Sequence, residues 1–372
     1  MTLREKIEQE IGTRGPIPFS RYMELCLYEP ELGYYSRNAE QFGKAGDFYT
    51  SSDVHAVFGR LLARQFEEMW RALGSPEEVR LLEVGPGRGL FAQDVLDWSE
   101  KKFPEFFRAV GYVLWEQSPA LRARLQKTLA RHLASAKARL ADVETGLPSV
   151  AAAAQIVFGN EFFDALPVEV LSVRGALRVG AQDGKFVETW APATGDELEF
   201  LDRYSVHPAS GERVEAALAS QRVMEEIASG MERGFLVFID YGYTRDEQLA
   251  GRHRGTVMAY RQHSASANPY EAPGEQDITA HVNFTALVAA AERHGVSAEK
   301  LRTQSQFLMG IGEANQFADA FEDCRLPQER AKVALQLKHL VTPLGMGETF
   351  HVLVGRKGVE EVALSGLSFG LR

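Results

Sequence analysis

The sequence predicts an α/β protein whose mostly parallel sheet has helices on both faces. From residue 79 onward, short apolar runs alternate with segments of helical periodicity, which is the pattern of parallel strands joined by crossover helices. One apolar run leads directly into a glycine-rich turn, the segment LLEVGPGRG at 81–89. With 372 residues and 45% hydrophobic composition, the chain has enough apolar surface for one large elaborated domain or for two domains.

The first 75 residues are predicted to be helical. Apolar side chains recur within 23–28, and a long amphipathic run extends over 53–73. Residues 51–53 (SSD) offer side-chain oxygens that cap a helix start, so the loop 46–50 is expected just ahead of a helix N-terminus.

The remaining elements are predicted from apolar runs and from helical periodicity. The strands are expected at Arg80–Val84, Tyr112–Trp115, Gln155–Phe158, Phe235–Ile239 and Thr349–Val354. The helices are expected at Leu90–Lys101, Pro119–Leu133, Phe284–His294 and Gln328–His339. Ser118 followed by Pro119 is a favourable helix start, because it combines a capping hydroxyl with a proline at the first helical position.

Residues 168–232 interrupt the alternation of strands and helices. The segments 168–179 and 185–190 flank Asp183-Gly184, a pair typical of two-residue hairpin turns, so we expect a hairpin within an insertion or small cap. The order of elements also requires a strand within 134–150, although the composition of that stretch is partly helical.

The composition excludes several classes of protein. A formal net charge of -10 argues against sequence-independent nucleic-acid binding, which depends on basic surface, and it is compatible with a cationic substrate. Cys26 and Cys324 lack the spacing of a disulfide framework or a metal site, so no metal is expected. No stretch approaches membrane-spanning length. Acidic residues within 1–12 argue against a signal or transit peptide, so a cytoplasmic protein is expected.

The glycine turn is typical of close contact between backbone and a small charged ligand. Gly85 and Gly87 lack the Cβ that would block a ligand, and they permit positive φ where the strand turns into the next helix. That helix then directs its N-terminus at the bound group. A dinucleotide fingerprint would need glycine at Leu90, whereas the third glycine is Gly89. The pattern favours S-adenosylmethionine over nicotinamide and flavin cofactors, and an ordinary tight turn is the alternative.

An acid closes the strand that follows the glycine turn. A carboxylate at this strand end, Glu116, is placed to accept hydrogen bonds from both ribose hydroxyls of an adenosine cofactor. The alternative is a surface glutamate that caps the helix starting near Ser118.

A third polar cluster is the segment GNEFFDALP at 159–167, after the strand expected across the switch point from the glycine turn. Ligands bind at the carboxyl ends of such strands. Glu161 and Asp164 would grip an amine or a guanidinium, with Asn160 fixing the backbone or accepting a hydrogen bond. The alternative is a loop whose acids cap a helix or solvate a turn.

Five ordered motifs together resemble the MidA-type methyltransferase family. They are GDF at 46–48 with TS at 50–51, EVGPGRG at 83–89, NEFFDALP at 160–167, DYGY at 240–243 and PGEQDITAHV at 273–282. The resemblance extends from about Pro18 to Gly355. Mitochondrial members of this family are complex I assembly factors that methylate arginine in a core subunit.

The resemblance implies the class I S-adenosylmethionine-dependent methyltransferase fold, a Rossmann-like mostly parallel sheet with helices on both faces. The implied regions are an N-terminal helical part over the cofactor (1–75), the methyltransferase core (76–167 and 233–358), an insertion or cap (168–232) and a C-terminal tail (359–372).

The resemblance also implies roles for individual cofactor-binding residues. Those expected to close or line the cofactor site are Gly46, Asp47, Phe48, Thr50, Glu83, Gly85, Gly87, Gly89, Glu116 and Asn160. Small departures from the family pattern occur at Tyr49 and at Ser52-Asp53, and 134–150 lacks the usual tryptophan.

The expected chemistry is in-line methyl transfer to an arginine of a protein. Arginine stays charged and is a poor nucleophile, so the Glu161 and Asp164 carboxylates would draw positive charge toward the nitrogens that do not react. Asp277 or His281 would bind substrate or remove a proton, the alternative for His281 being a packing role.

The partner implied by the resemblance is a respiratory complex I subunit. Two other functions remain open: methylation of a small molecule or of a different residue, and a cofactor-binding assembly chaperone with little or no transferase activity. The oligomeric state is not predicted.

Overall fold

The computed structural model describes residues 1–37, 56–144, 146–147, 154–261, 264–343 and 345–369. Within these ranges the chain forms two compact units. Unit 1 consists of the described parts of Met1–Phe48, Phe162–Glu225 and Tyr241–Ala290, and unit 2 of those of Tyr49–Glu161, Glu226–Asp240 and Ala291–Arg372.

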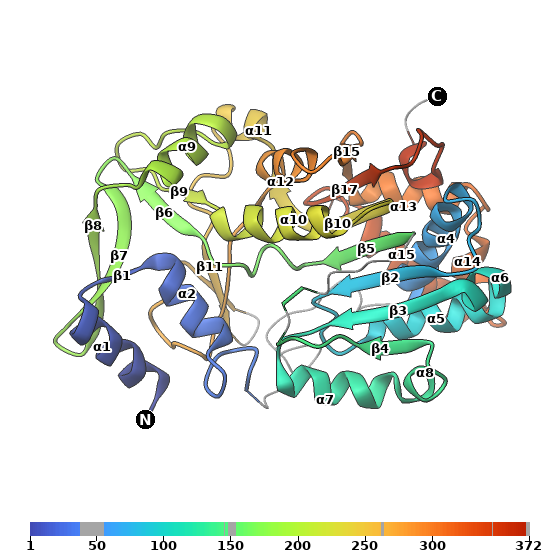
Figure 1. Cartoon of the computed structure of the whole chain (residues 1–372), viewed down its shortest axis with the longest axis horizontal. Coiled ribbons are helices and arrows are strands. Elements are labelled where there is room, and N and C mark those ends of the chain that lie inside the picture. The colour runs from blue at the N-terminus through green and yellow to red at the C-terminus, as the bar shows by residue number, and fades with distance from the viewer. Residues whose placement is uncertain (38–55, 145, 148–153, 262–263, 344, 370–372) are drawn as a thin grey trace. The chain divides into compact units, whose positions relative to one another are not determined.

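Unit 2 is built on a mostly parallel sheet (Figure 1). Its strands are β2 (Val79–Val84), β3 (Val110–Trp115), β4 (Ala138–Leu140), β5 (Gln155–Asn160), β10 (Gly234–Tyr243), β15 (Ser297–Ala298), β16 (Arg302–Thr303) and β17 (Phe350–Lys357). Their order is β15-β17-β10-β5-β2-β3-β4, with β16 pairing with β17. The pairs from β10 to β4 are parallel, and the short strands β15 and β16 are antiparallel to β17.

This order places a switch point between β2 and β5. The chain proceeds from β2 to β3 and β4 on one side, and then continues to β5 and β10 on the other. The register pairs Val84 of β2 with Trp115 of β3 and with Gly159 of β5, so the three carboxyl ends lie at one edge. Ligands of open α/β sheets bind at this edge.

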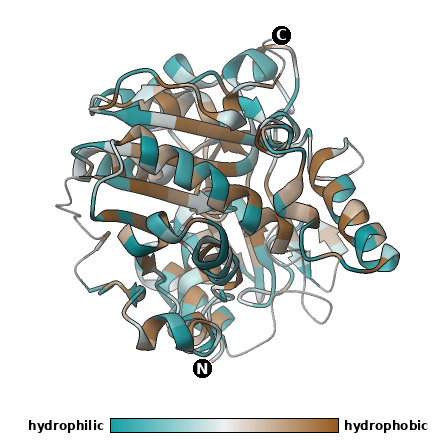
Figure 2. Ribbon diagram, turned by 90° about the vertical axis from the view of Figure 1, so that its right-hand side faces the viewer, coloured by the Kyte–Doolittle hydropathy of each residue, from teal (hydrophilic) through white to brown (hydrophobic). Residues whose placement is uncertain are grey.

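The helices of unit 2 follow the sequence alternation. They are α4 (Ala56–Ala72), α5 (Leu90–Lys102), α6 (Pro104–Ala109), α7 (Pro119–Thr128), α8 (Ala130–Ala134), α13 (Gln304–Glu313), α14 (Ala318–Phe321) and α15 (Pro327–Val341), with a 3-10 turn, η1 (Ser365–Leu367). Strands of the sheet are largely hydrophobic, as the brown parts of the ribbons in Figure 2 show, and most residues of β2 and β3 are buried. Helix α4 packs against α5, and Gly59 lets the two approach, because a Cβ there would lie 2.6 Å from Cβ of Asp94.

Unit 1 combines helices with a small antiparallel sheet. It contains α1 (Leu3–Arg14), β1 (Ile17–Pro18), α2 (Phe19–Tyr28), β6 (Glu169–Ser172), β7 (Gly175–Gln182), β8 (Lys185–Ala191), α9 (Gly195–Tyr204), β9 (Val214–Ala216), α11 (Arg245–Leu249), β11 (Met258–Arg261), β12 (Ser264–Ser266), β13 (Asp277–Thr279) and β14 (Val282–Asn283). Strands β11, β12 and β13 form a second antiparallel sheet, and β14 pairs with the end of β10. Helices α10 (Leu218–Gly230) and α12 (Phe284–Glu292) run from one unit into the other.

Most elements expected from the sequence are confirmed. The expected hairpin is β7–β8, and its turn residues Asp183 and Gly184 have φ of 51° and 71°, as a primed two-residue turn requires. The strand expected within 134–150 is β4 at the sheet edge. The single helix expected over Pro119–Leu133 is instead two helices, α7 and α8, which meet at Leu129.

The compact units group some residues differently from the regions expected from the sequence, and those regions stay a prediction. Residues 241–290, expected in the methyltransferase core, lie in unit 1 together with 168–225. The reason is tertiary packing, since Ala259 and Ile278 are buried in the same hydrophobic cluster as Phe19. Helix α4, expected with the N-terminal region, belongs to unit 2.

Candidate functional site

The glycine turn follows β2 at the switch point of unit 2. Gly85, Gly87 and Gly89 have φ of 65°, 54° and 77°, so each adopts the left-handed conformation expected from the sequence. At Gly87 a Cβ would meet no heavy atom of the described residues within 4 Å, so with respect to them the space beside this residue is open. Helix α5 begins directly after the turn, with Gly89 as its N-cap. This arrangement presents backbone to a ligand.

Glu116 lies at the end of β3 and binds the glycine turn directly. Its Oε2 accepts a hydrogen bond from the Gly87 N–H at 3.1 Å, and its Oε1 accepts one from the Ser118 N–H at 2.9 Å. The side chain is buried, and burial raises the pKa of this carboxyl to about 7. A carboxylate has about four acceptor positions. Backbone N–H groups of Gly87, Gln117 and Ser118 interact with this carboxyl, and a ribose hydroxyl would donate to the acceptor capacity that they leave.

Glu83 lies inside the sheet on β2. Its Oε2 accepts a hydrogen bond from the Tyr112 hydroxyl at 2.7 Å, and burial raises its pKa to about 8. Ser118 caps α7 by accepting a hydrogen bond from the Leu121 N–H, as expected from the Ser-Pro pair. The cofactor contact expected at Glu83 stays a prediction.

Asn160 and Glu161 end strand β5 beside the glycine turn. The Asn160 amide donates to Oε1 of Glu161 at 2.9 Å, and the Glu161 N–H donates to the Ile239 carbonyl at 2.9 Å. Glu161 has φ of 50°, a conformation that a residue with a side chain adopts at a cost. Such strain is typical of functional positions.

The residues of unit 2 fit an adenosine cofactor. The Gly87 backbone, the strained Glu161 and the buried Glu116 carboxylate follow the ends of neighbouring strands. Four of the cofactor-binding residues expected from the sequence, Gly46, Asp47, Phe48 and Thr50, lie outside the described residues, as do the helix-capping residues 51–53.

Unit 1 holds the other three expected catalytic residues. Asp164 is buried, its Oδ2 accepts from the Tyr241 hydroxyl at 2.5 Å, and its carbonyl accepts from the Ala280 N–H at 2.9 Å. Burial raises the pKa of Asp164 to about 6, and the Tyr241 hydrogen bond opposes the rise. Glu161 belongs to unit 2, and the boundary between the units falls directly after it.

Asp277 lies on β13 in the same unit as Asp164. Its Oδ1 accepts from the Tyr35 hydroxyl at 2.8 Å, and the side chain is buried. Burial raises the pKa of Tyr35, and the charges of Asp277 and Asp164 add to this effect. Tyr260 also has a raised pKa, from burial and from the same two acids. The two carboxylates therefore share one tyrosine-rich region of unit 1.

His281 follows β13 and pairs with a residue that sequence reasoning missed. Its Nδ1 lies 3.0 Å from Nδ1 of His253, and its ring meets the ring of Tyr241 edge to face at a centroid distance of 5.4 Å. Neither His253 nor Tyr35 has a sequence signal, because each is an isolated residue brought in by tertiary folding.

Metal coordination and membrane spanning have no structural support among the described residues. No group of three or more His, Cys, Asp or Glu side chains there is arranged to hold a metal ion. Among the helices in the same part of the chain, none combines the length and the apolar character needed to span a membrane.

Comparison with known proteins gives consistent results across nearly the whole chain. Residues 61–301 match the family described as "Putative S-adenosyl-L-methionine-dependent methyltransferase". A Drosophila melanogaster protein named protein arginine methyltransferase NDUFAF7 homolog, mitochondrial, is 30% identical over 96% of this chain and 85% of its own length. The Homo sapiens protein arginine methyltransferase NDUFAF7, mitochondrial, is 26% identical over 92% of this chain and 80% of its own.

The fold is also similar to a solved structure. A COG1565 superfamily member from Burkholderia thailandensis, solved bound to S-adenosyl-homocysteine, has a TM-score of 0.84 and 30% sequence identity. The match covers 98% of this chain and 94% of that one. S-adenosyl-homocysteine is the product that remains when S-adenosylmethionine has given up its methyl group.

Proposed function

This chain belongs to the family of S-adenosylmethionine-dependent methyltransferases, and we propose that it transfers the methyl group to an arginine of a protein. Its relatives from fly and human are named protein arginine methyltransferases. One structural observation supports the proposal most: the strained Glu161 follows β5 directly, and β5 is next to the glycine-turn strand.

The residues proposed to hold the cofactor lie at the switch point of unit 2. S-adenosylmethionine supplies a methyl group on a sulfonium, which makes that methyl open to attack by a nitrogen. Backbone of the turn at Gly85, Gly87 and Gly89 would lie against the methionine end, and Glu116 would accept the ribose hydroxyls. Glu83 and Asn160 complete the proposed cofactor set, with the GDF motif at 46–48 and Thr50.

The proposed acceptor is a guanidinium gripped by Glu161 and Asp164. Carboxylates hold guanidinium through paired charge-assisted hydrogen bonds and draw positive charge toward the nitrogens they contact. The remaining nitrogen then regains lone-pair character for in-line attack on the methyl carbon. Alignment of that kind contributes about 7–11 kcal/mol to catalysis.

Asp277 and His281 are proposed to bind the substrate or to take up its proton. Asp277 shares the tyrosine-rich region of unit 1 with Asp164, so a second negative charge supports binding of a cation there. The pKa of His281 is lowered by burial, so its ring is neutral near pH 7 and open to a proton.

The proposed partner is a subunit of a complex I-type respiratory enzyme, as the resemblance to the MidA-type family implies. The net charge of -10 suits a cationic substrate segment. The cytoplasmic location expected from the sequence stays part of this proposal, whereas the fly and human relatives are named as mitochondrial proteins.

The test uses S-adenosylmethionine labelled in its methyl group, together with cell lysate and the purified chain, and mass spectrometry then locates the label. Label on arginine of a protein is the expected result. Label on a metabolite or on another residue type would mean that this molecule or residue is the substrate instead of arginine. Cofactor binding without methyl transfer would indicate a cofactor-binding chaperone.

The role of Glu161 is tested separately. Glu161→Gln should slow transfer by about 10²-fold or more while leaving the affinity for S-adenosyl-homocysteine unchanged in calorimetry. Glu105→Gln, at an exposed glutamate of the same unit, is the matched control and should behave as wild type. Wild-type turnover in Glu161→Gln would show that the guanidinium grip is wrong.

A further inference from the structure

His253 and His281 form a hydrogen-bonded pair in unit 1. Their Nδ1 atoms lie 3.0 Å apart, and their ring centroids are 5.3 Å apart with the planes inclined at 52°. A hydrogen bond between two ring nitrogens needs one donor and one acceptor. In the neutral pair, therefore, one ring carries its proton on Nδ1 and the other carries it on Nε2.

This geometry defines how many protons the pair accepts. The ring that donates through Nδ1 has a lone pair on Nε2, and a proton added there leaves the Nδ1–Nδ1 hydrogen bond intact. A second proton would place N–H groups on both Nδ1 atoms, facing each other at 3.0 Å. The pair therefore accepts its first proton without losing this hydrogen bond, and a second proton breaks the bond.

The backbone holds His253 in an uncommon conformation. His253 has φ of 55°, and its carbonyl accepts a hydrogen bond from the Gln248 amide at 3.2 Å. Its ring stacks on Tyr243 at 5.2 Å with an interplanar angle of 18°. On the other side, the His281 N–H donates to the Thr256 hydroxyl at 3.1 Å. Both histidines are thus held in place by contacts independent of the pair.

The pair is connected to the acid proposed to hold the substrate. The His281 ring packs edge to face against Tyr241, whose hydroxyl donates to Asp164 at 2.5 Å. The residue before His281, Ala280, donates its N–H to the Asp164 carbonyl. Both histidines are partly exposed, so water reaches the pair as well.

We propose that His253 and His281 act as a proton outlet for the methyl transfer, with His281 receiving the proton and His253 passing one on to water. This inference rests on the proposed function. When the substrate nitrogen attacks, an N–C bond forms and the C–S bond breaks with its electron pair going to sulfur. The nitrogen then loses one proton, which passes to Nε2 of His281, the ring that donates through Nδ1. The Nδ1 proton of His281 moves to Nδ1 of His253, and His253 releases its Nε2 proton to water, so both rings are neutral again.

The charged and polar surroundings favour a neutral pair before reaction. Burial, together with the neighbouring His253, lowers the pKa of His281 to about 4. Burial also lowers the pKa of His253. The charge of Glu247 opposes this decrease, and the charge of Arg252 adds to it. The other groups that face the pair, Tyr241, Tyr243 and Thr256, are neutral at pH 7.

The wild-type chain itself provides the first test. Proton NMR of the histidine rings is recorded without substrate as the pH is lowered. The pair of His253 and His281 should take up its first proton in one step and its second proton only at clearly lower pH. Two independent titrations at ordinary histidine pKa values would overturn the proposal, whatever the substrate proves to be.

The second test uses His253→Asn. Asparagine tolerates positive φ and offers an amide to His281, but it does not carry a proton onward. Turnover should fall by about tenfold or more, and imidazole added to the buffer should restore it. His207→Asn, an exposed histidine of the same unit paired with Asp202, is the control and should keep wild-type turnover.

The outcomes separate this inference from the proposed function. Wild-type turnover with an unchanged pH profile in His253→Asn, or a loss that imidazole does not restore, would overturn the proton outlet. If the wild-type chain transfers no methyl group to arginine at all, the proposed function fails. The NMR titration still tests whether His253 and His281 titrate as a coupled pair.

Discussion

Gly87 is the residue at which the proposed cofactor site is most sensitive to a side chain. It has φ of 54°, open space beside its Cα, and an N–H that donates to Glu116. The backbone conformation and the free space are two separate reasons for glycine at this position.

We therefore expect Gly87→Val to abolish binding of S-adenosyl-homocysteine in calorimetry, because the branched side chain would occupy the open space. The matched control is Gly74→Val, since Gly74 also has positive φ and no heavy atom within 4 Å of a Cβ. Both variants should lose about 1–3 kcal/mol of stability through backbone strain. Unchanged affinity in Gly87→Val would contradict the proposed cofactor position.

Glu116 should make cofactor binding depend on pH. Burial raises its pKa to about 7 in the free protein, and the ionised carboxylate is the form that accepts two hydroxyl hydrogen bonds. Binding should therefore strengthen as pH rises through 7, by about tenfold between pH 6 and pH 8.

The measurement compares the wild type with Glu116→Gln across this range, because the cofactor and other groups titrate equally in both proteins. The difference in affinity between the two should grow with pH. A constant difference would mean that Glu116 does not change its charge in this range.

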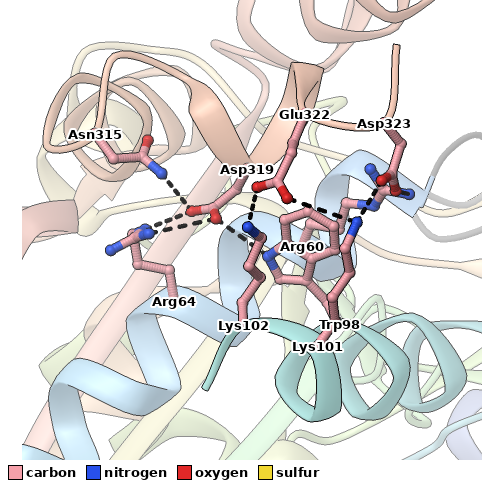
Figure 3. A network of polar contacts seen from close by, with 9 residues as sticks. All are labelled: Arg60, Arg64, Trp98, Lys101, Lys102, Asn315, Asp319, Glu322 and Asp323. Atoms are coloured by element: carbon pink, nitrogen blue, oxygen red, sulfur yellow. Dashed lines mark hydrogen bonds and ion pairs between the residues drawn. The ribbon is translucent and has the colours of Figure 1, made fainter. Parts of the chain in front are cut away.

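At the scale of elements, a network of hydrogen bonds and ion pairs connects the segment 315–323 to helices α4 and α5 of unit 2 (Figure 3). Asp319 on α14 is buried and accepts hydrogen bonds from Arg64 of α4, from Trp98 of α5 at 3.2 Å and from Asn315 at 2.6 Å. Asp323 lies at the outer end of the network and pairs with Arg60 and Lys101. Glu322, also exposed, pairs with Lys101 and Lys102, so Asp319 is the buried carboxylate among the three labelled in Figure 3.

Asp319→Ala should destabilise the chain by about 3 kcal/mol, because it leaves the Arg64 guanidinium without its buried partner. The control is Asp323→Ala, whose exposed ion pairs are worth about 1 kcal/mol or less. Denaturant unfolding measures both values. Equal losses of unfolding free energy in the two variants would mean that the buried position of Asp319 makes no extra contribution to stability.

At the scale of the whole molecule, the expected cofactor-binding and catalytic residues are distributed over two compact units. The glycine turn, Glu116, Asn160 and Glu161 belong to unit 2, whereas Asp164, Asp277 and His281 belong to unit 1. Domains within one chain often open separately, so a ligand bound to one unit stabilises mainly that unit.

Hydrogen exchange measures how the stabilisation by a bound ligand is divided between the two units. At a concentration of S-adenosyl-homocysteine 100 times its dissociation constant, opening of unit 2 should cost about 2.7 kcal/mol more. Amides of β2, β3 and β5 should therefore exchange more slowly, and those of the β7–β8 hairpin should be unchanged. Equal slowing in both places would show that the two units open as one.

The sequence alone determined the sheet and the glycine turn. Local patterns were sufficient, because alternating apolar runs and glycines at fixed offsets act through neighbouring residues: β2, β3, β5, β10 and β17 lie where they were expected. The position of Glu116 directly after a strand was predictable for the same reason, because the end of β3 is marked in the local sequence.

Only the tertiary structure decided which distant residues meet. Residues 241–290 join the unit of α1 and α2 because their apolar side chains share one core, which no local pattern encodes. The pairing of His253 with His281 and of Tyr35 with Asp277 depends on the same packing. Strain at Glu161 and His253 is equally invisible in the sequence, because surrounding contacts, not the residue type, impose a positive φ.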